Sequence, residues 1–407
     1  MLTKQQHTWE RRIVFFLISQ AITLFGSTLV QMAIIWYVTI GTSSGVWVAA
    51  FTVCSYLPQF FISFLGGVWA DHLNSKWLIV GADLAIATAT LLLIVVMPYL
   101  SGDTMVLNSL LVISAFRSLA TGIQTPAVHA LIPRLVPREH LMRYNGFNTT
   151  LQSMVQFAAP AVAGVVLSIS TLRFTMFLDV VTAVIGVGII ACLVLPKHQK
   201  VNEKVSVFEQ MHIGFKYVYA HKMLVRLLVV YAGFIFLTVP GGFLAGLLVR
   251  RSYGDTYWHL TAVELIGFAG MVIGGVLMSV WGGFSSKTKT LYYSLFAFGV
   301  CAIGMGGINN FNLYLLFMLF YGIAMTSAQT SMTTLFHEHT KVSMQGRVFG
   351  LLSSMYSGFL PLGMMLFGPL ADMLPLQWII IGSGVFLMLI ALAIRFHEYK
   401  FNIVAAP

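Results

Sequence analysis

Twelve apolar stretches, each about as long as a bilayer is thick, constrain this chain more than any other feature. A membrane-crossing helix needs about 20 predominantly apolar residues. Runs of that size cover residues 13–39, 46–70, 77–99, 105–127, 145–169, 174–195, 224–249, 258–282, 289–309, 312–335, 347–373 and 377–396. Because hydrophobic residues make up 58% of the chain and charged residues only 9%, a water-soluble fold would expose a very large apolar surface. The sequence therefore predicts an all-α polytopic membrane protein with twelve transmembrane helices.

The basic residues predict how this helical chain is oriented. The formal charge is +10, and all Lys and Arg residues except Arg117, Arg173, Arg250 and Arg251 lie near the termini or in the loops that follow even-numbered helices. Since cytoplasmic loops carry the excess of Lys and Arg, both termini are predicted to be cytoplasmic, as an even number of spans also requires. Topology accounts for the positive charge, so no nucleic-acid partner is expected.

A polar segment divides the chain into two halves. Residues 196–223 carry several lysines and contain apolar residues at near-helical spacing, which predicts an amphipathic surface helix. We therefore expect a six-helix half at 1–195, a cytoplasmic linker at 196–223 and a second six-helix half at 224–407. Weak internal repeats, such as Pro160 and Pro361 at comparable depth, fit two parallel six-helix repeats.

The turn after the second apolar run carries the first recognisable motif. It reads Gly66-Gly67-Val68-Trp69-Ala70-Asp71-His72-Leu73-Asn74-Ser75-Lys76. Gly67, Asp71 and Lys76 match the Gly-x-x-x-Asp-Arg-x-x-Arg-Lys signature of the major facilitator superfamily, which this turn resembles, whereas His72 and Ser75 replace arginines. The resemblance implies a gating hinge. The alternative is a generic positive loop with one acidic cap.

Arg117 lies inside an apolar span, where a charged side chain is costly and marks a functional site by default. Arg117 and Gly122 are similar to the superfamily's fourth-helix motif, which implies a role in proton coupling. Asp83, about two turns into the third predicted helix, is the expected partner of Arg117. The pair is interpreted either as a structural ion pair or as part of the coupling machinery.

Asp179 and Glu264 are the other carboxylates within predicted spans, and either is a candidate to carry a proton or to meet a cationic substrate. The alternative for both is permanent pairing with neighbouring groups. In the first helix, Gln31, Met32 and Trp36 are candidates for lining a substrate cavity, with lipid-facing or interfacial packing as the favoured alternative for any one of them.

The fifth predicted helix contains Ala159-Pro160-Ala161-Val162-Ala163-Gly164, in which Pro160 and Gly164 match the Gly-Pro-x-x-Gly-Gly signature of superfamily antiporters. Close packing of small residues around a proline bend explains the same stretch without any coupling role. Together with Gly122, these two residues are therefore predicted to serve helix packing.

Further motifs resemble the macrolide-efflux branch of the superfamily: Thr125-Pro-Ala127, Leu135-Val-Pro137 and Gly346-Arg-Val-Phe-Gly350. The resemblance implies a drug:proton antiporter in the cytoplasmic membrane of a bacterium, alternating between two states. Its partners would be a small amphiphilic substrate, protons and membrane lipids, and a monomer is compatible with that function. The proton gradient would supply the energy without any cofactor.

Other motifs that would change this interpretation are absent from the sequence. There is no Gly-x-x-x-x-Gly-Lys-Ser/Thr phosphate loop and no His-Glu-x-x-His zinc motif, so neither an ATP-driven pump nor an enzyme is expected. Cys54, Cys192 and Cys301 show no paired spacing and are interpreted as free thiols rather than metal ligands. The remaining alternatives are export of a tetracycline or a catecholate siderophore, import of a nutrient, or a membrane partner that does not transport.

Overall fold

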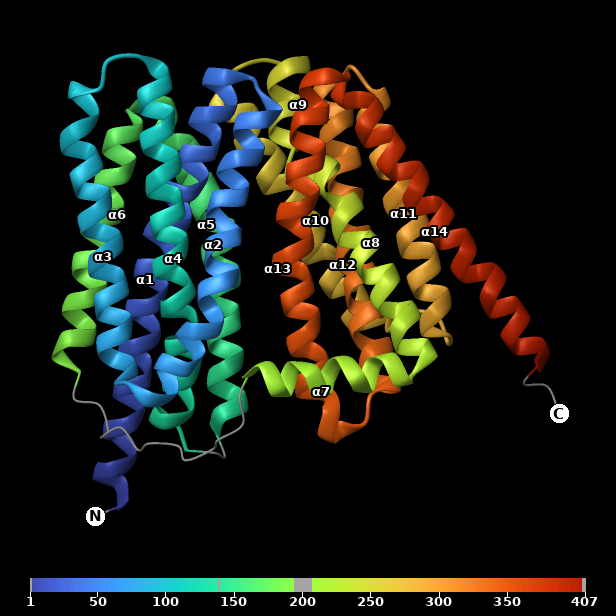
Figure 1. Ribbon diagram of the computed structural model, residues 1–407, viewed down its shortest axis with the longest axis horizontal. Helices are drawn as coiled ribbons and strands as arrows, with labels where there is room; N and C mark the ends of the chain where they lie inside the picture. The colour runs from blue at the N-terminus through green and yellow to red at the C-terminus, as the bar shows by residue number, and fades with distance from the viewer. Residues whose placement is uncertain (1, 138–139, 194–206, 405–407) are drawn as a thin grey trace. The chain divides into compact units, whose positions relative to one another are not determined.

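The protein is helical throughout the part that its structure, a computed structural model, describes: residues 2–137, 140–193 and 207–404 (Figure 1). Twelve segments in this part are helical, long and apolar enough to cross a membrane. The predicted fold class and number of spans are therefore confirmed. The length of each apolar run was sufficient for this prediction because the backbone of a lipid-exposed segment can satisfy its hydrogen bonds only within a helix or a closed barrel.

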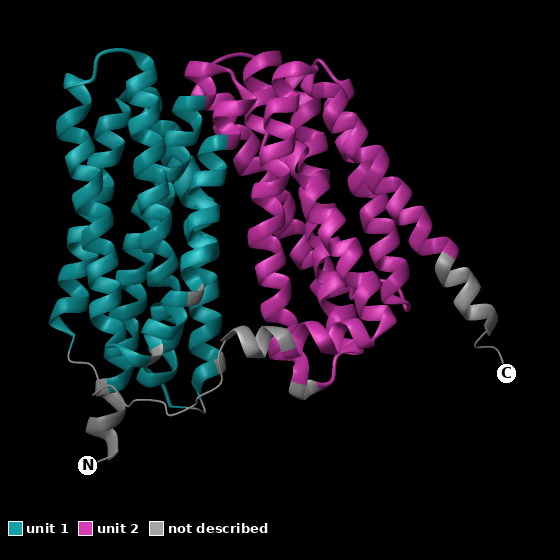
Figure 2. Ribbon diagram, viewed as in Figure 1, with its two compact units in different colours: residues 1–38, 50–204 teal, residues 39–49, 205–407 magenta. Residues whose placement is uncertain are grey.

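The chain forms two compact units (Figure 2). The first contains residues 1–38 and 50–204, and the second contains residues 39–49 and 205–407. The turn at 39–49 thus belongs to the second unit by its contacts, although it lies in the first half of the sequence. The predicted boundaries at residues 195 and 224 did not assign residues 39–49 to the second unit.

The first unit is built from six long helices and one short 3₁₀ turn. They are α1 (Leu2–Thr42), α2 (Gly45–His72), α3 (Ser75–Val96), η1 (Met97–Tyr99), α4 (Asp103–Leu135), α5 (Leu141–Ile169) and α6 (Leu172–Cys192). The second unit takes the C-terminal end of α1 and the N-terminal end of α2.

The second unit contains the remaining helices. They are α7 (Val207–Ala220), α8 (Lys222–Gly242), α9 (Ala245–Ser252), α10 (Tyr257–Trp281), α11 (Lys287–Gly307), α12 (Phe311–His339), α13 (Val342–Met373) and α14 (Leu376–Val404). The amphipathic helix predicted in the linker corresponds to α7, which buries Val218 and exposes Tyr219. Residues 194–206 of that linker lie outside the described residues.

One predicted span differs from the structure. The stretch 224–249 was predicted as one helix, but it consists of α8 and α9 with a break at Phe243 and Leu244. The break follows Pro240, Gly241 and Gly242, because proline disrupts the helical hydrogen-bond ladder and glycine is a poor helix former.

Polar side chains define several helix starts. The side chain of Asn74 accepts a hydrogen bond from the Lys76 amide and begins α3, and Thr171 accepts one from the Phe174 amide at the start of α6. These caps satisfy amides that have no partner within their helix. They fix the ends of two of the helices that carry the buried charges described below.

Small residues bring the helices of the first unit together. A Cβ on Gly66 of α2 would lie 2.6 Å from the carbonyl oxygen of Gly122 on α4, so these two backbones touch. Between α1 and α6, the Ser19 hydroxyl donates to the carbonyl oxygen of Gly186 at 3.1 Å. Such close approach is typical of helix pairs in membranes. It leaves α3 packed against both α4 and α6, the arrangement on which the candidate site depends.

Candidate functional site

The centre of the first unit holds an ion pair between Arg117 on α4 and Asp179 on α6. The Arg117 side chain is 9% exposed and that of Asp179 only 1%, so both charges are removed from solvent. The Nη1 atom of Arg117 donates to Asp179 Oδ2 and also to the Thr90 hydroxyl on α3, the latter at 2.7 Å. Thr90 in turn donates to the Ile86 carbonyl oxygen at 2.9 Å. Three helices are therefore linked through one guanidinium group.

Asp83 does not pair with Arg117, and that predicted pairing is wrong. Its Oδ1 accepts a hydrogen bond from Gln124 Nε2 on α4 at 2.7 Å, and Asp83 is only 3% exposed. The register of two neighbouring helices explains the difference. Asp83 and Thr90 are seven residues apart on α3, and their partners Gln124 and Arg117 are seven residues apart in the opposite direction on α4. Seven residues of helix span about 10 Å. Arg117 therefore meets α3 well beyond Asp83.

The second oxygen of Asp83 is unusual among the described residues. Asp83 Oδ2 is buried and has no hydrogen-bond partner there, and the carboxylate lies close enough to Asp179 for the two to repel each other. An unpaired oxygen of a buried carboxylate is costly. Asp83 is thus the least satisfied member of this cluster, whereas Asp179 is held by an arginine.

Gly26 of α1 covers the ion pair from the side. A Cβ at this position would overlap the Thr182 hydroxyl and lie 3.0 Å from Asp179 Oδ1. Only a residue without a side chain allows α1 to approach α6 this closely. The helix backbone itself therefore helps to exclude solvent from Asp179.

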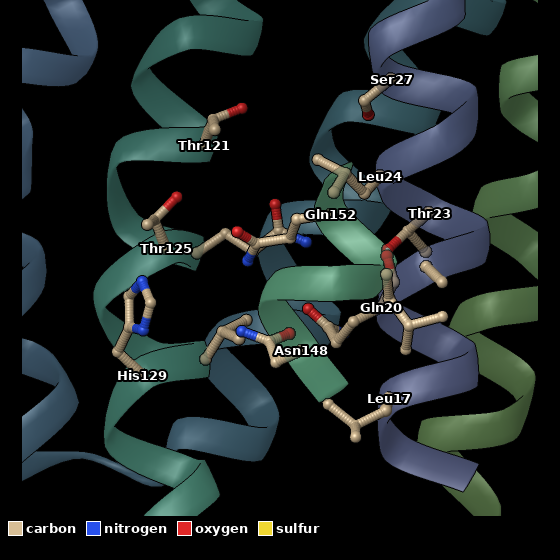
Figure 3. A pocket seen from close by; sticks show the side chains of 14 residues that line it. Leu17, Gln20, Thr23, Leu24, Ser27, Thr121, Thr125, His129, Asn148 and Gln152 are labelled. Carbon is tan, nitrogen blue, oxygen red and sulfur yellow. The ribbon is translucent and has the colours of Figure 1, made fainter. Parts of the chain in front are cut away.

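A pocket of about 110 Å³ lies in the same unit, lined by residues of α1, α4 and α5 (Figure 3). The residues around it are mostly amides, hydroxyls and small apolar groups: Leu17, Gln20, Ala21, Thr23, Leu24, Ser27, Thr121, Gln124, Thr125, Val128, His129, Asn148, Leu151 and Gln152. None of these fourteen is Asp, Glu, Lys or Arg. Gln20 Nε2 is a buried donor without a partner among the described residues. The pocket therefore offers hydrogen bonds but no formal counter-charge.

A second pocket of about 60 Å³ lies in the same unit. Both pockets are lined by Ser27 and Thr121, and Arg117 lies in the wall of the second. Arg117, Thr121 and Gln124 are spaced along one face of α4. One side of this helix thus carries the ion pair, the pocket wall and the hydrogen bond to Asp83.

The predicted hinge is built around Lys76 in the described part of the structure. Its Nζ donates to the carbonyl oxygens of Ala191 and Leu193 at 2.9 and 2.8 Å, at the end of α6. Cations at the carboxyl end of a helix are stabilising. The side chain of Asp71 lies outside the described residues. Gly67 has open space around it, and its neighbour Gly66 makes the close contact with α4.

The other predicted residues are spread over the chain. Gln31 lines the second pocket, whereas Met32 and Trp36 line neither, and Trp36 is buried at 3% exposure. Pro160 and Gly164 are buried in α5, in keeping with a packing role.

Glu264 lies on α10 of the second unit, whereas the other three coupling candidates belong to the first unit. It is close enough to Tyr314 for an electrostatic interaction. The Tyr314 hydroxyl is buried without a hydrogen-bond partner among the described residues.

Sequence reasoning missed Gln124 and the amides of the pocket. A polar stripe in an apolar span could have identified Gln124 from the sequence. The residues that recur there at helical spacing are Arg117, Thr121, Gln124, Thr125 and His129. Such a stripe indicates the helix face that turns away from lipid. The partners on the other two helices show the same kind of spacing, with Gln20, Thr23 and Ser27 on α1 and Asn148 and Gln152 on α5.

In the described part of the chain, twelve membrane-length helices with a buried ion pair define a multi-pass membrane protein. Residues 16–359 match the family described as Major Facilitator Superfamily, and the chain belongs to this superfamily. It is 28% identical to Macrolide efflux protein A of Streptococcus pyogenes over 397 residues, which is 96% of each chain. It is also 22% identical to the Staphyloferrin A transporter of Staphylococcus aureus over 369 residues, 88% of this chain and 89% of the relative. The predicted resemblance to macrolide-efflux transporters is confirmed.

Solved structures show the same fold at low sequence identity. A variant of the nucleoside transporter NupG matches with a TM-score of 0.70 and 14% identity, covering 94% of this chain and 98% of that chain. A bacterial homologue of the iron transporter ferroportin matches with a TM-score of 0.66 and 15% identity, covering 94% and 98%. These likenesses establish the fold and carry no information on the substrate.

Proposed function

We propose that this protein exports a macrolide or a similar amphiphilic compound from the cytoplasm of a bacterium in exchange for protons. The similarity to Macrolide efflux protein A over nearly the whole of both chains carries this proposal. The protein would lie in the cytoplasmic membrane with both termini inside, as the distribution of Lys and Arg favours.

In this proposal the uncharged pocket of the first unit receives the polar groups of the substrate. Nine of its wall residues carry an amide, a hydroxyl or an imidazole, while apolar side chains such as Leu17 and Leu24 suit the hydrocarbon part of an amphiphile. Hydrogen-bonding walls discriminate well between substrates because an unmatched buried polar group is costly. The pocket would therefore supply specificity as well as affinity.

Protons would act on the buried carboxylates beside the pocket. Asp179 is paired with Arg117, whereas Asp83 has a single hydrogen-bond donor and one oxygen without a partner among the described residues. A proton on either acid would change the balance of charge around Arg117. Two halves alternating about a central site would convert this change into transport.

Export of a siderophore is the second candidate. The match to the Staphyloferrin A transporter supports it, at lower identity and coverage than the macrolide-efflux relative. A pocket rich in amides and hydroxyls also suits a ligand with many oxygen atoms.

Erythromycin susceptibility of a pump-deficient bacterial host tests the proposal. Cells that express the chain should tolerate more erythromycin than cells with an empty vector, and a protonophore should abolish the efflux of radiolabelled drug. Arg117→Gln should lose gradient-driven efflux, whereas the exposed control Arg173→Gln should retain it. Wild-type protein that reaches the membrane without protecting against erythromycin would refute macrolide export. Restored siderophore secretion in an exporter-deficient strain would then support the second candidate.

A further inference from the structure

Among the described residues that line the first pocket, Gln124 is the one whose side chain donates a hydrogen bond to a buried carboxylate. Its amide has two chemically different ends, a carbonyl oxygen that only accepts hydrogen bonds and an NH₂ group that only donates them. We propose that Gln124 reports the protonation state of Asp83 to the pocket by reversing its amide, so that the pocket wall changes from a hydrogen-bond acceptor to a donor.

With Asp83 ionised, the orientation of the amide is determined. A carboxylate only accepts hydrogen bonds, so Gln124 must present Nε2 to Asp83 Oδ1, as observed at 2.7 Å. The amide carbonyl oxygen is then available to the pocket side. In this state the pocket favours a substrate hydroxyl, which can donate a hydrogen bond to Gln124.

When Asp83 binds a proton, the opposite orientation becomes favourable. A proton on Oδ2 would place a buried O–H donor on the oxygen that has no hydrogen-bond partner among the described residues. A proton on Oδ1 avoids this cost if that O–H donates to the Gln124 carbonyl oxygen, which requires the amide to turn. The NH₂ group then faces the pocket and no longer accepts a hydrogen bond from the substrate hydroxyl.

The consequence is exchange between a proton and a hydroxyl-bearing substrate. The substrate binds well while Asp83 is ionised, and its affinity falls when Asp83 takes up one proton. No covalent bond forms or breaks except the O–H bond to that proton. This inference rests on the proposed function and adds to it the chemical class of the recognised group, a hydrogen-bond donor such as a sugar or ring hydroxyl.

Other charged and titratable groups lie near Gln124 and Asp83. Arg117 on α4 and Asp179 on α6 form the neighbouring ion pair, and Asp179 is close enough to Asp83 to repel it. His129 on α4 lines the pocket itself. A pH effect that belongs to Gln124 and Asp83 must therefore survive replacement of His129.

Erythromycin binding to the purified full-length protein, measured by calorimetry from pH 5.5 to 8.5, tests the inference. At low pH the substrate hydroxyl would lose one hydrogen bond and face the NH₂ donor of Gln124. The affinity of the wild type for erythromycin should therefore be about tenfold or more lower at pH 5.5 than at pH 8.5. Gln124→Met and Asp83→Asn should each remove this pH dependence, and their combination should add nothing further. Gln152→Met, in the same pocket but without a contact to Asp83, should weaken binding equally at every pH, and His129→Gln should keep the pH dependence.

Wild-type pH dependence in Gln124→Met, or its loss in His129→Gln, would overturn the inference while leaving macrolide export intact. Absence of erythromycin binding in the wild type would instead refute the proposed substrate. In that case infrared spectroscopy of the substrate-free protein still tests the contact between Gln124 and Asp83. The carboxyl band assigned with Asp83→Asn should shift in Gln124→Met as its hydrogen bond is lost, and an unshifted band would exclude the proposed contact.

Discussion

Replacing Arg117 with methionine should destabilise the protein far more than replacing both members of its ion pair. Asp179 is 1% exposed, so the single change leaves a buried carboxylate without its arginine and leaves the Thr90 hydroxyl without its donor. Breaking a buried pair from one side costs about 3–5 kcal/mol, which lowers the ratio of folded to unfolded protein by about two to four orders of magnitude. Exchange of both groups for apolar side chains is often neutral or stabilising.

The appropriate measurement is the free energy of unfolding in lipid bicelles for Arg117→Met, Asp179→Leu and the double variant. We expect losses of about 3–5 kcal/mol for each single change and less than about 1 kcal/mol for the pair, so the double-mutant cycle should show strong coupling. Arg173→Met, an exposed arginine at the start of α6, is the matched control and should stay within about 0.5 kcal/mol. Additive losses in the double variant would refute mutual stabilisation of the two charges.

Two further perturbations address the packing of α1 and the turn that follows it. Gly26→Ala should cost about 1–3 kcal/mol because its Cβ would overlap Thr182 and approach Asp179, whereas Gly81→Ala, with open space around it, should be neutral or slightly stabilising; equal melting temperatures for both would contradict the close contact. Asp372 accepts hydrogen bonds from the amides of Gly45 and Val46 at 2.6 and 2.9 Å, at the start of α2. Asp372→Ala should therefore accelerate hydrogen exchange of these two amides about tenfold to a hundredfold, and unchanged protection would show that the carboxylate does not hold the turn.

The fold was predictable from the sequence because lipid imposes a simple rule on each span separately. An apolar run of sufficient length must become a helix whatever its neighbours are, so twelve runs gave twelve spans. The break between α8 and α9 was missed because Pro240, Gly241 and Gly242 lie inside a stretch whose hydropathy is continuous. Hydropathy reports length and burial, and it does not register a local change of direction.

The candidate site was predictable only in part. Arg117 was identified because the cost of burying its charge is a property of a single residue. Its partner was assigned to Asp83 instead of Asp179, because that choice depends on the register of α4 against α3 and α6, which no single helix encodes. Gln124 was overlooked for a similar reason, because its proposed role depends on its hydrogen bond to Asp83, a carboxylate on another helix.

We propose that the two interpretations of the buried charges, structural pairing and proton coupling, apply to different acids. Asp179 is held in place by its ion pair with Arg117, and Gly26 lets α1 cover it. Asp83 lies beside this pair with one oxygen unpartnered among the described residues and a second negative charge nearby. A cluster that served stability alone would be fully satisfied, because a half-satisfied polar network is worse than an apolar core. Asp83 is therefore the member of the cluster that we expect to change its protonation state, with the Arg117–Asp179 pair as the fixed frame around it.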